Sequence, residues 1–371
     1  MRDVYAARAA RAYAAMLRRF RRRSGVYRRD SRFHATGTAA HLWPFSRAIV
    51  ATLDLAGIGQ GLVPDVDLTA AITDRVQALD RYWDPDRHPP AYSSDLRGSR
   101  LGGDRYYDDN AWVGLALVQL ERIRPGSGHL QRAEELFRFA LSGWSGSATP
   151  NPGGVFWVEQ GRGAGVANHD RNLVSTAPNA ELGLHIAELT GESSVEKAVG
   201  PPEMYDWVLA TLDASKGTTA PGTGLFWDKL RGDGTTDHAT WSYNQGSMVG
   251  LNVLLARRPV GGDPVYLRRA EEIARKALHE FAGAYDRQPA AFHAIFFRNL
   301  LLLHSATRDA ELRGAIIEAL RGYVDHAWNE RRDRRDRFHL SHGGVTLLNQ
   351  SALVQLLALL AWHPDDYRVL A

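Results

Sequence analysis

Apolar residues recur at helical spacing along almost the whole chain. In most segments they fall at positions i, i+3, i+4 and i+7, which is typical of amphipathic or buried helices. No alternating pattern longer than a few residues suggests a substantial strand. We therefore expect twelve helices, covering roughly residues 2–23, 37–57, 67–83, 107–123, 127–143, 173–190, 202–213, 240–256, 264–283, 290–305, 308–328 and 345–362.

Two kinds of helix alternate in this series. Every second helix, beginning near residues 37, 107, 173, 240, 290 and 345, is rich in small and apolar residues on all sides. The others, such as 267–281 and 309–324, carry one charged face and one apolar face. A helix that is apolar all round is buried, whereas an amphipathic helix covers a core. Six inner and six outer helices in alternation predict an (α/α)6 barrel, formed by residues 1–371 as a single domain.

The inner helices begin in polar or aromatic sequences, and these should meet at one rim of the barrel. Three long stretches, roughly 84–106, 144–172 and 214–239, lead into inner helices and are rich in Gly, Pro, Asp and aromatic residues. Long connections in a compact domain are usually functional. We expect them to wall a cleft over that rim. The helix starts concerned are His41-Leu42-Trp43, Tyr107-Asp108-Asp109, Ser175-Thr176-Ala177-Pro178-Asn179, Ser242-Tyr243-Asn244-Gln245-Gly246, Ala291-Phe292-His293 and Ser341-His342-Gly343-Gly344.

Composition narrows the class of protein. Hydrophobic residues make up 44% and charged residues 23% of the 371 positions, as in globular proteins with a sizeable core. There is no cysteine, and no apolar run is long enough to span a bilayer. Arg recurs every few residues near the N-terminus, so no secretory signal is seen. We expect a cytoplasmic protein, or a secreted one if a leader has been removed.

The N-terminal part of the chain carries a concentration of positive charge. The net charge is +3, and an Arg cluster lies at residues 18–29. Such a cluster could contact an anionic polymer, but a solvated helix end is the simpler interpretation. We expect no nucleic-acid partner.

The most informative motif is Tyr106-Tyr107-Asp108-Asp109-Asn110-Ala111-Trp112, at the start of an inner helix. Burying a carboxylate is costly unless it is paired or functional, and one Asp would suffice as a helix cap. Retaining glycosidases need two carboxyl groups about 5 to 5.5 Å apart, which neighbouring Asp residues can provide. A helix N-terminus favours an ionised nucleophile, while the adjacent charge keeps the second carboxyl protonated. Residue patterns leave open which Asp has which role. A second pair, Asp365-Asp366, lacks aromatic neighbours and should be exposed.

Aromatic residues accumulate around the same rim. Sugar rings stack on aromatic faces, while amide and carboxylate groups read their hydroxyls. We therefore predict a carbohydrate cleft, with packing roles for Trp144, Trp207, Trp328 and Trp362. The aromatic residues expected at the rim are Trp83, Trp112, Trp157, Trp227, Trp241, Tyr82, Tyr92, Tyr106, Tyr107 and Tyr243.

Other catalytic chemistry has weaker support. His339 and His342 could bind a metal, but no third ligand is evident, so we expect none. The Gly-rich segment 161–165 follows no strand and lacks a Lys-Ser/Thr pair, which disfavours a phosphate loop. No GxSxG elbow is present, and cysteine catalysis is excluded.

These motifs together resemble glycoside hydrolase family 76, the endo-α-1,6-mannanases. The segment Tyr107-Asp108-Asp109-Asn110-Ala111-Trp112 is similar to the family signature. Other segments are similar in order and spacing: His41-Leu42-Trp43-Pro44, Ser175-Thr176-Ala177-Pro178-Asn179, Gly224-Leu225-Phe226-Trp227-Asp228, Tyr243-Asn244-Gln245-Gly246 and Phe292-His293-Ala294-Ile295-Phe296.

The resemblance implies an (α/α)6 fold, retaining hydrolysis of α-1,6-linked mannose polymers, and no cofactor. It implies that Asp108 is the nucleophile and Asp109 the acid/base. The chain departs from the family in having His293-Ala294 where a Lys is often found. The side chains expected to contact an oligo- or polysaccharide are Tyr106, Tyr107, Asn110, Trp112, Trp43, Trp157, Asn179, Trp227, Asp228, Tyr243, Asn244, Gln245 and His293.

Two alternatives remain open from the residues. The barrel could be a sugar epimerase or isomerase that uses His238, His293 or His342 as bases. It could also be a carbohydrate-binding protein that has lost turnover.

Overall fold

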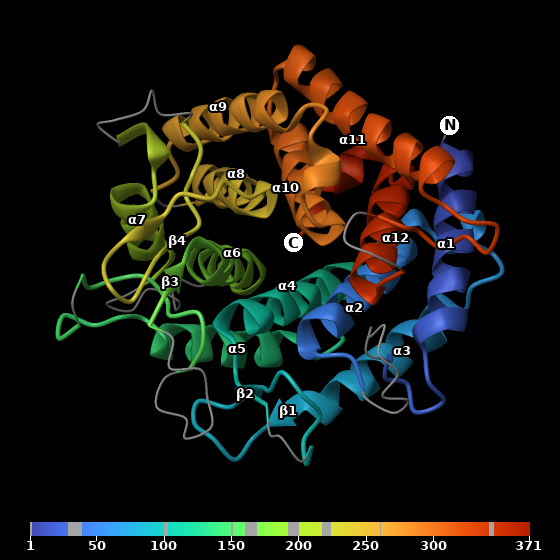
Figure 1. The fold of residues 1–371 in the computed structure, drawn as a ribbon, viewed down its shortest axis with the longest axis horizontal. Coiled ribbons are helices and arrows are strands. Elements are labelled where there is room, and N and C mark those ends of the chain that lie inside the picture. Colours follow the sequence, from blue (N-terminus) through green and yellow to red (C-terminus); the bar gives the residue numbers. More distant parts are fainter. Residues whose placement is uncertain are drawn as a thin grey trace.

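Twelve α-helices form two concentric rings in the computed structural model (Figure 1). These helices lie within the residues that the structure describes, which are 2–28, 39–99, 103–149, 151–159, 169–191, 200–216, 224–259, 261–340 and 345–371. The inner ring consists of α2 (Leu42–Ile58), α4 (Tyr107–Ile123), α6 (Leu173–Thr190), α8 (Ser242–Arg257), α10 (Ala290–Ala306) and α12 (Leu347–Ala361). The outer ring consists of α1 (Arg2–Phe20), α3 (Leu68–Leu79), α5 (Leu130–Ser142), α7 (Pro201–Thr211), α9 (Pro264–Phe281) and α11 (Ala310–Glu330).

The inner ring is closed. Each inner helix packs against the next, and α12 packs against α2, so that the last inner helix meets the first. The outer helix α1 packs on α12, and each of the others packs on the inner helix that precedes it. This arrangement is the predicted (α/α)6 barrel.

The burial of each helix follows its sequence pattern. Nearly every residue of α12 is buried, because this helix has protein on all sides. In contrast, α9 buries mainly Ala270, Ile273, Ala274, Ala277 and Phe281, which share one face. Inner helices also approach one another closely. A Cβ atom at Gly246 of α8 would lie 2.6 Å from the Cα atom of Phe296 in α10, so only glycine fits there.

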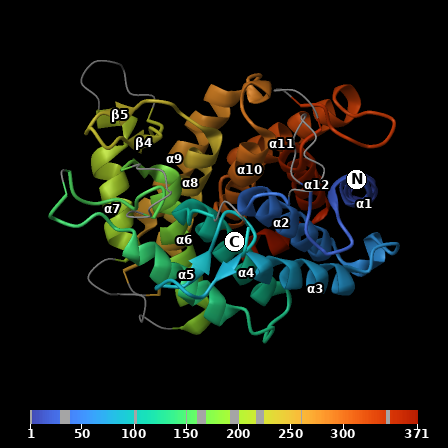
Figure 2. The same cartoon turned by 60° about the horizontal axis from the view of Figure 1, so that its bottom comes forward.

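Short strands tie the long loops together. The strand β1 (Trp83–Asp84) forms an antiparallel pair with β2 (Ala91–Tyr92) within the first long loop. The strand β4 (Lys229–Leu230) lies between β3 (Arg171–Asn172) and β5 (Thr236–Asp237). This second sheet joins two long loops next to α7, at the edge of the ring (Figure 2).

The segment that follows α12 lies against the barrel at the end away from the inner-helix starts. It forms a 3-10 turn over Pro364–Val369. The Arg298 Nε atom then donates to the Ala371 backbone oxygen at 2.6 Å, and the Ala371 N–H donates to the Gln119 side chain at 2.8 Å. Within the described part of the chain, no helix is long and apolar enough to cross a membrane.

Candidate active site

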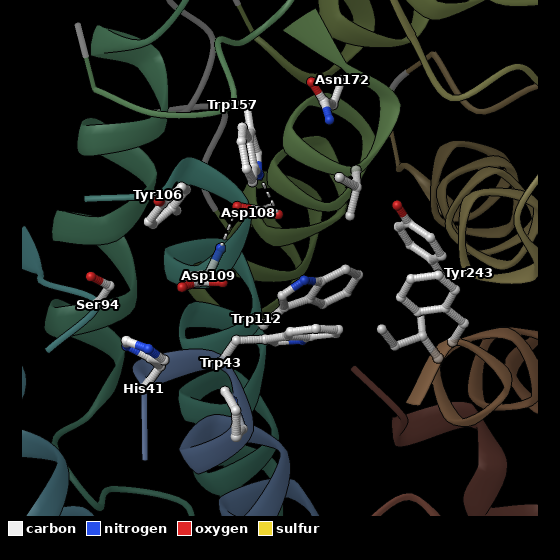
Figure 3. A pocket seen from close by; sticks show the side chains of 14 residues that line it. His41, Trp43, Ser94, Tyr106, Asp108, Asp109, Trp112, Trp157, Asn172 and Tyr243 are labelled. Atoms are coloured by element: carbon white, nitrogen blue, oxygen red, sulfur yellow. Dashed lines mark hydrogen bonds between the residues drawn. The ribbon is translucent and has the colours of Figure 1, made fainter. Parts of the chain in front are cut away.

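A pocket of about 420 Å³ opens where five inner helices begin. Its walls come from the starts of α2, α4, α6, α8 and α10 and from the two loops before α4 and α6. This is the rim at which the sequence placed the polar helix starts. The pocket is lined by His41, Trp43, Pro44, Ser94, Tyr106, Asp108, Asp109, Trp112, Trp157, Asn172, Val174, Tyr243, Phe292 and Ile295 (Figure 3).

The first turn of α4 holds the carboxyl pair in this pocket. The Tyr107 N–H donates to the Trp157 carbonyl at 3.0 Å, and Tyr106 forms a β-bridge with Val158. The helix start is therefore fixed to the loop that precedes α6. Asp108 and Asp109 follow at once, and both side chains reach the pocket (Figure 3).

The Asp108 carboxyl accepts two N–H groups. The Asp109 backbone N–H donates to Oδ1 at 3.0 Å, and the Trp157 Nε1–H donates to Oδ2 at 3.3 Å. Burial raises the pKa of Asp108 to about 7, although these two donors oppose the rise because they favour the charged form. The nearby charge of Asp228 adds a smaller upward effect on this pKa.

The Asp109 carboxyl has a different environment. Burial raises its pKa well above the ordinary value, and the charge of Asp108 raises it further. Arg47 acts in the opposite direction. The two carboxyls therefore titrate as a coupled pair, with the proton held more strongly on Asp109.

Aromatic faces surround the carboxyls. In Figure 3, Trp157 lies on one side of Asp108, and Trp112 and Trp43 lie on the other. The Trp157 ring packs on Tyr106 with centroids 5.1 Å apart. The Trp43 Nε1–H has no hydrogen-bond partner within the described residues, so it is available to a ligand. Tyr243 and Phe292 form the facing wall, with ring centroids 4.0 Å apart.

Four of the predicted ligand contacts instead hold the site from behind, and they do not line the pocket. Asn110 donates to the carbonyls of Tyr92 and Tyr106 at 3.0 and 2.8 Å, and accepts from the Tyr92 N–H at 2.8 Å. Asn179 donates to the Tyr107 carbonyl at 3.2 Å.

The other two are Tyr107 and Gln245. The Tyr107 ring stacks on Phe139 with centroids 4.4 Å apart, and Gln245 binds the Phe226 backbone through both of its side-chain polar atoms. These four side chains contact protein, although the Asn179 Oδ1 atom has no hydrogen-bond partner within the described residues.

The loop before α8 also lies behind the pocket. Among its described residues, none lines the cavity. Asp228 accepts from Asn244 at 3.0 Å and from the Tyr243 hydroxyl at 3.4 Å, so it supports the Tyr243 wall. Trp227 stacks on His238 with centroids 4.1 Å apart. The expectation that all three long loops wall the cleft is wrong for this loop as far as it is described.

His293 is a core residue. Its Nδ1 is 3.0 Å from the Ser242 hydroxyl, and its Nε2 is 2.7 Å from the Tyr285 carbonyl. Burial lowers its pKa to about 4, so the ring is neutral at neutral pH. It neither lines the pocket nor offers a free nitrogen. The structure therefore places His293 in the core, and it does not support a ligand contact there.

Several aromatic residues expected at the rim also belong to the core. Tyr82 is fully buried and donates to the Ala40 carbonyl at 2.7 Å. Tyr92 is buried against Trp83, with ring centroids 4.9 Å apart. These residues support the loop before α4, whereas Tyr106, Trp112, Trp157 and Tyr243 reach the cavity as predicted.

The pocket also contains residues that were not among the predicted ligand contacts. These are His41, Ser94, Asn172 and Val174, at or just before an inner-helix start or in a loop before one, and Ile295, the sixth residue of α10. Their position at the rim was a usable signal.

Arg47 was also missed. It is buried on the inner helix α2, among mostly apolar residues, as is Asp54. A charged residue within such an apolar run was the signal for both.

The described residues hold no cluster of three His, Cys, Asp or Glu side chains that could bind a metal. His339 lies 3.0 Å from Asp333, with which it pairs. His342 and the Gly-rich segment 161–165 lie outside the described residues.

Comparison with known proteins places this geometry in a family. A family profile described as Glycosyl hydrolase family 76 matches residues 79–350. Among curated proteins, none matches the chain significantly.

Solved structures show the same fold. A family 76 glycoside hydrolase (mannosidase) from Bacteroides thetaiotaomicron VPI-5482 superposes with a TM-score of 0.80 at 21% identity, covering 96% of this chain and 98% of that chain. An inactive variant of an α-1,6-mannanase of Salegentibacter sp. HEL1_6, in complex with α-1,6-mannotriose, gives a TM-score of 0.73 at 16% identity, covering 96% and 99%. A D-mannose isomerase gives 0.65 at 14% identity, covering 95% and 97%.

The family match spans well over half of the chain and includes the helix that carries the paired carboxyls. The barrel and the pocket at its rim agree with that match. The chain therefore belongs to glycosyl hydrolase family 76 and is a glycoside hydrolase.

Proposed function

We propose that this enzyme hydrolyses α-1,6-mannosidic linkages in mannan or in mannose-containing glycoconjugates, with retention of the anomeric configuration. The observation that carries the proposal is the pair of adjacent carboxyls with unequal partners, set among aromatic faces in one pocket. Asp108 is the nucleophile and Asp109 the general acid/base.

The unequal partners support these roles. A nucleophile must be ionised, and the two N–H donors at Asp108 favour its carboxylate. The start of α4 adds the positive end of a helix dipole. A general acid must hold a proton near neutral pH, and burial together with the Asp108 charge keeps Asp109 protonated.

The reaction then proceeds in two displacements. Asp109 gives its proton to the glycosidic oxygen while an Asp108 oxygen bonds to the anomeric carbon and the leaving sugar departs. Water next attacks the anomeric carbon, Asp109 takes a proton from that water, and the bond to Asp108 breaks. Each displacement inverts the anomeric carbon, so the configuration is retained overall.

The walls of the pocket suit a hexose. Trp43, Trp112 and Trp157 present aromatic faces on which the C–H side of a sugar ring can stack. Asn172, Ser94 and His41 supply polar atoms at its margin for the hydroxyl groups.

The choice of mannose and of the α-1,6 linkage draws support from the relatives. The Salegentibacter α-1,6-mannanase that binds α-1,6-mannotriose was inactivated by Asp-to-Asn changes at two consecutive positions. The consecutive Asp108 and Asp109 form the corresponding kind of pair in this chain.

The experiment is to incubate the enzyme with linear α-1,6-mannan oligosaccharides and to follow the products and their anomeric form by NMR. Asp108→Asn and Asp109→Asn are tested in parallel. We expect the α-anomer to form first and turnover to be lost in both variants. Initial release of the β-anomer, or near-normal turnover in either variant, would contradict the mechanism.

The same experiment addresses both alternatives. Oligosaccharide binding without any product would indicate a binding protein. An isomerase would interconvert free monosaccharides, and it would need a His base in the pocket. Of the three histidines considered for that role, His293 is buried and bonded, His238 does not line the pocket, and His342 lies outside the described residues. We therefore favour hydrolysis.

A further inference from the structure

Charged side chains lie inside the barrel, directly beneath the pocket. Trp43, Arg47 and Asp54 of α2 are spaced four and seven residues apart, so they form one stripe along the helix. Trp43 lines the pocket, and the other two follow below it. Arg47 is 3% exposed and Asp54 is fully buried. Buried charges are costly unless they are paired, so this stripe requires an explanation.

Arg47 lies against Trp112, a residue that lines the pocket. Its guanidinium carbon is 5.2 Å from the centre of the Trp112 ring. Trp112 lies one helical turn after Asp109 on α4, and both residues line the pocket. The Arg47 Nε–H has no hydrogen-bond partner within the described residues. Burial, with a smaller effect of Arg298, lowers the pKa of Arg47 to about 9, so it is still a cation at neutral pH.

The next carboxylate along α2, that of Asp54, is bound by another arginine. Arg298 of α10 donates to one oxygen of Asp54 through both terminal nitrogens, at 2.8 and 2.9 Å. Two arginines therefore share one carboxylate, which leaves a surplus positive charge beneath the pocket. Asp109 is the other carboxyl that interacts electrostatically with Arg47.

Among the described residues, Arg47 is the one cation that acts on Asp109. His41 lies 3.0 Å from Asp95 at the margin of the pocket. Burial raises the pKa values of Tyr106 and Tyr243, which are neutral at neutral pH. Asp228 faces Asp108 and would add only negative charge.

We propose that Arg47 is a positioning residue of the reaction, which stabilises the ionised form of Asp109 from beneath Trp112. The proposal builds on the hydrolysis proposed above. This role of Arg47 follows from the two functions of Asp109, which must first donate a proton and then accept one.

The charge balance of the second displacement shows where Arg47 acts. After the first displacement Asp109 is a carboxylate, and Asp108 is uncharged because it forms an ester with the anomeric carbon. Arg47 is then the opposite charge that acts on Asp109. When water bonds to the anomeric carbon, Asp109 accepts its proton, and the electron pair of the breaking bond returns to Asp108. A carboxylate held by Arg47 is available for that step, whereas without Arg47 it would be reprotonated more readily.

The test measures the ionisation of Asp109 without substrate. The protein is labelled with ¹³C at Asp carboxyls, and the Asp109 signal, assigned with Asp109→Asn, is titrated by NMR. Replacing Arg47 with Met removes the charge and keeps the length of the side chain. We expect the pKa of Asp109 to rise by about 0.5 to 1 unit. An unchanged pKa in Arg47→Met would overturn the proposal.

Arg75→Met is the matched control. It removes another buried arginine that lies over an aromatic ring, that of Tyr27, but Arg75 does not act on Asp109, so the pKa of Asp109 should stay at the wild-type value. Arg47→Gln provides a second charge-free variant if the Met variant does not fold. Arg47→Lys keeps the charge and should restore the wild-type pKa. An equal rise in Arg75→Met would mean that the loss of any buried arginine perturbs the pocket, and it would also overturn the proposal.

A kinetic experiment tests the same step. An aryl α-mannoside with an activated leaving group needs little acid help in the first displacement, so the second limits its turnover. For Arg47→Met we expect kcat and KM to fall together, by about three- to tenfold, with a burst of aryl product and little change in kcat/KM. A fall in kcat/KM without a burst would indicate a merely structural role. If no mannoside is cleaved at all, the proposed hydrolysis fails, while the NMR titration still decides the role of Arg47.

Discussion

The contact between Trp157 and Asp108 allows a quantitative test of the proposed nucleophile. Replacing Trp157 with Phe keeps an aromatic ring against Tyr106 and removes the N–H that reaches the carboxylate, together with part of the ring surface. Asp108 keeps its other donor, the Asp109 backbone N–H. Lost ring surface lowers binding at every pH, so a shift of the acid limb reports the loss of one hydrogen bond to the charged form of the nucleophile.

The geometry sets the expected size of the effect. Hydrogen bonds to charged groups contribute about 1.5 to 3 kcal/mol, and the best ones are about 2.7 to 2.9 Å long. At 3.3 Å, the Trp157 bond should lie at the lower end of that range. Since about 1.4 kcal/mol corresponds to one pKa unit, its loss should raise the pKa of Asp108 by about one unit.

The assay is the pH dependence of kcat/KM on an α-1,6-mannan oligosaccharide. Asp108 must be ionised to attack, so its pKa sets the acid limb of the profile. In Trp157→Phe this limb should move up by about one pH unit, with a roughly tenfold lower rate below it. Trp241→Phe is the control, because Trp241 packs on Phe292 and does not line the pocket. An acid limb within about 0.2 unit of wild type, or a shift to lower pH, would refute the reasoning.

Three further results are expected. Asp108→Asn should lower turnover about 10³-fold or more. The melting temperature of this variant, measured by calorimetry, should match that of wild type near pH 4 and exceed it by roughly 2–4 °C at pH 8. The reason is that burial raises the folded-state pKa of Asp108, so wild type loses stability as pH rises above the unfolded value of about 4, whereas Asn does not. Gly246→Ala should lower the free energy of unfolding, measured in urea, by about 1–3 kcal/mol, because α10 leaves no room for a Cβ atom. Gly314→Ala has open space around it and should raise the free energy of unfolding by up to about 1 kcal/mol. Asn110→Ala should cost about 2–4 kcal/mol in the same assay and reduce kcat/KM, because the buried backbone of Tyr92 loses its partners; unchanged stability would contradict that role.

Local patterns in the sequence were enough to predict the barrel. Inner and outer helices differ in how many of their sides are apolar, and this difference can be recognised in the sequence of each helix alone. The starts of the inner helices therefore identified the rim. Neighbouring sequence also distinguished Asp108-Asp109, which lie in the pocket among aromatic side chains, from Asp365-Asp366, which are exposed.

The direction of each polar side chain at the rim could not be predicted. Asn110, Asn179 and Gln245 follow the same kind of helix start as the residues that line the pocket, but each binds backbone from another segment. Whether such a side chain faces the ligand or a loop depends on where that loop lies. The buried site of His293 likewise depends on Ser242 and Tyr285, which belong to other elements.

The closure of the inner ring has a consequence for how the chain reaches its native state. The Gln350 side chain of α12 donates to the Ala12 carbonyl of α1, and the Gln355 side chain donates to the Arg47 carbonyl of α2, across more than 300 residues. During synthesis, the apolar sides of α1 and α2 that pack on α12 stay exposed until α12 has been made. Such late, non-local contacts slow folding and leave apolar surface exposed until they form. A newly made chain that still lacks α12 therefore exposes apolar surface of α1 and α2 that the complete barrel buries.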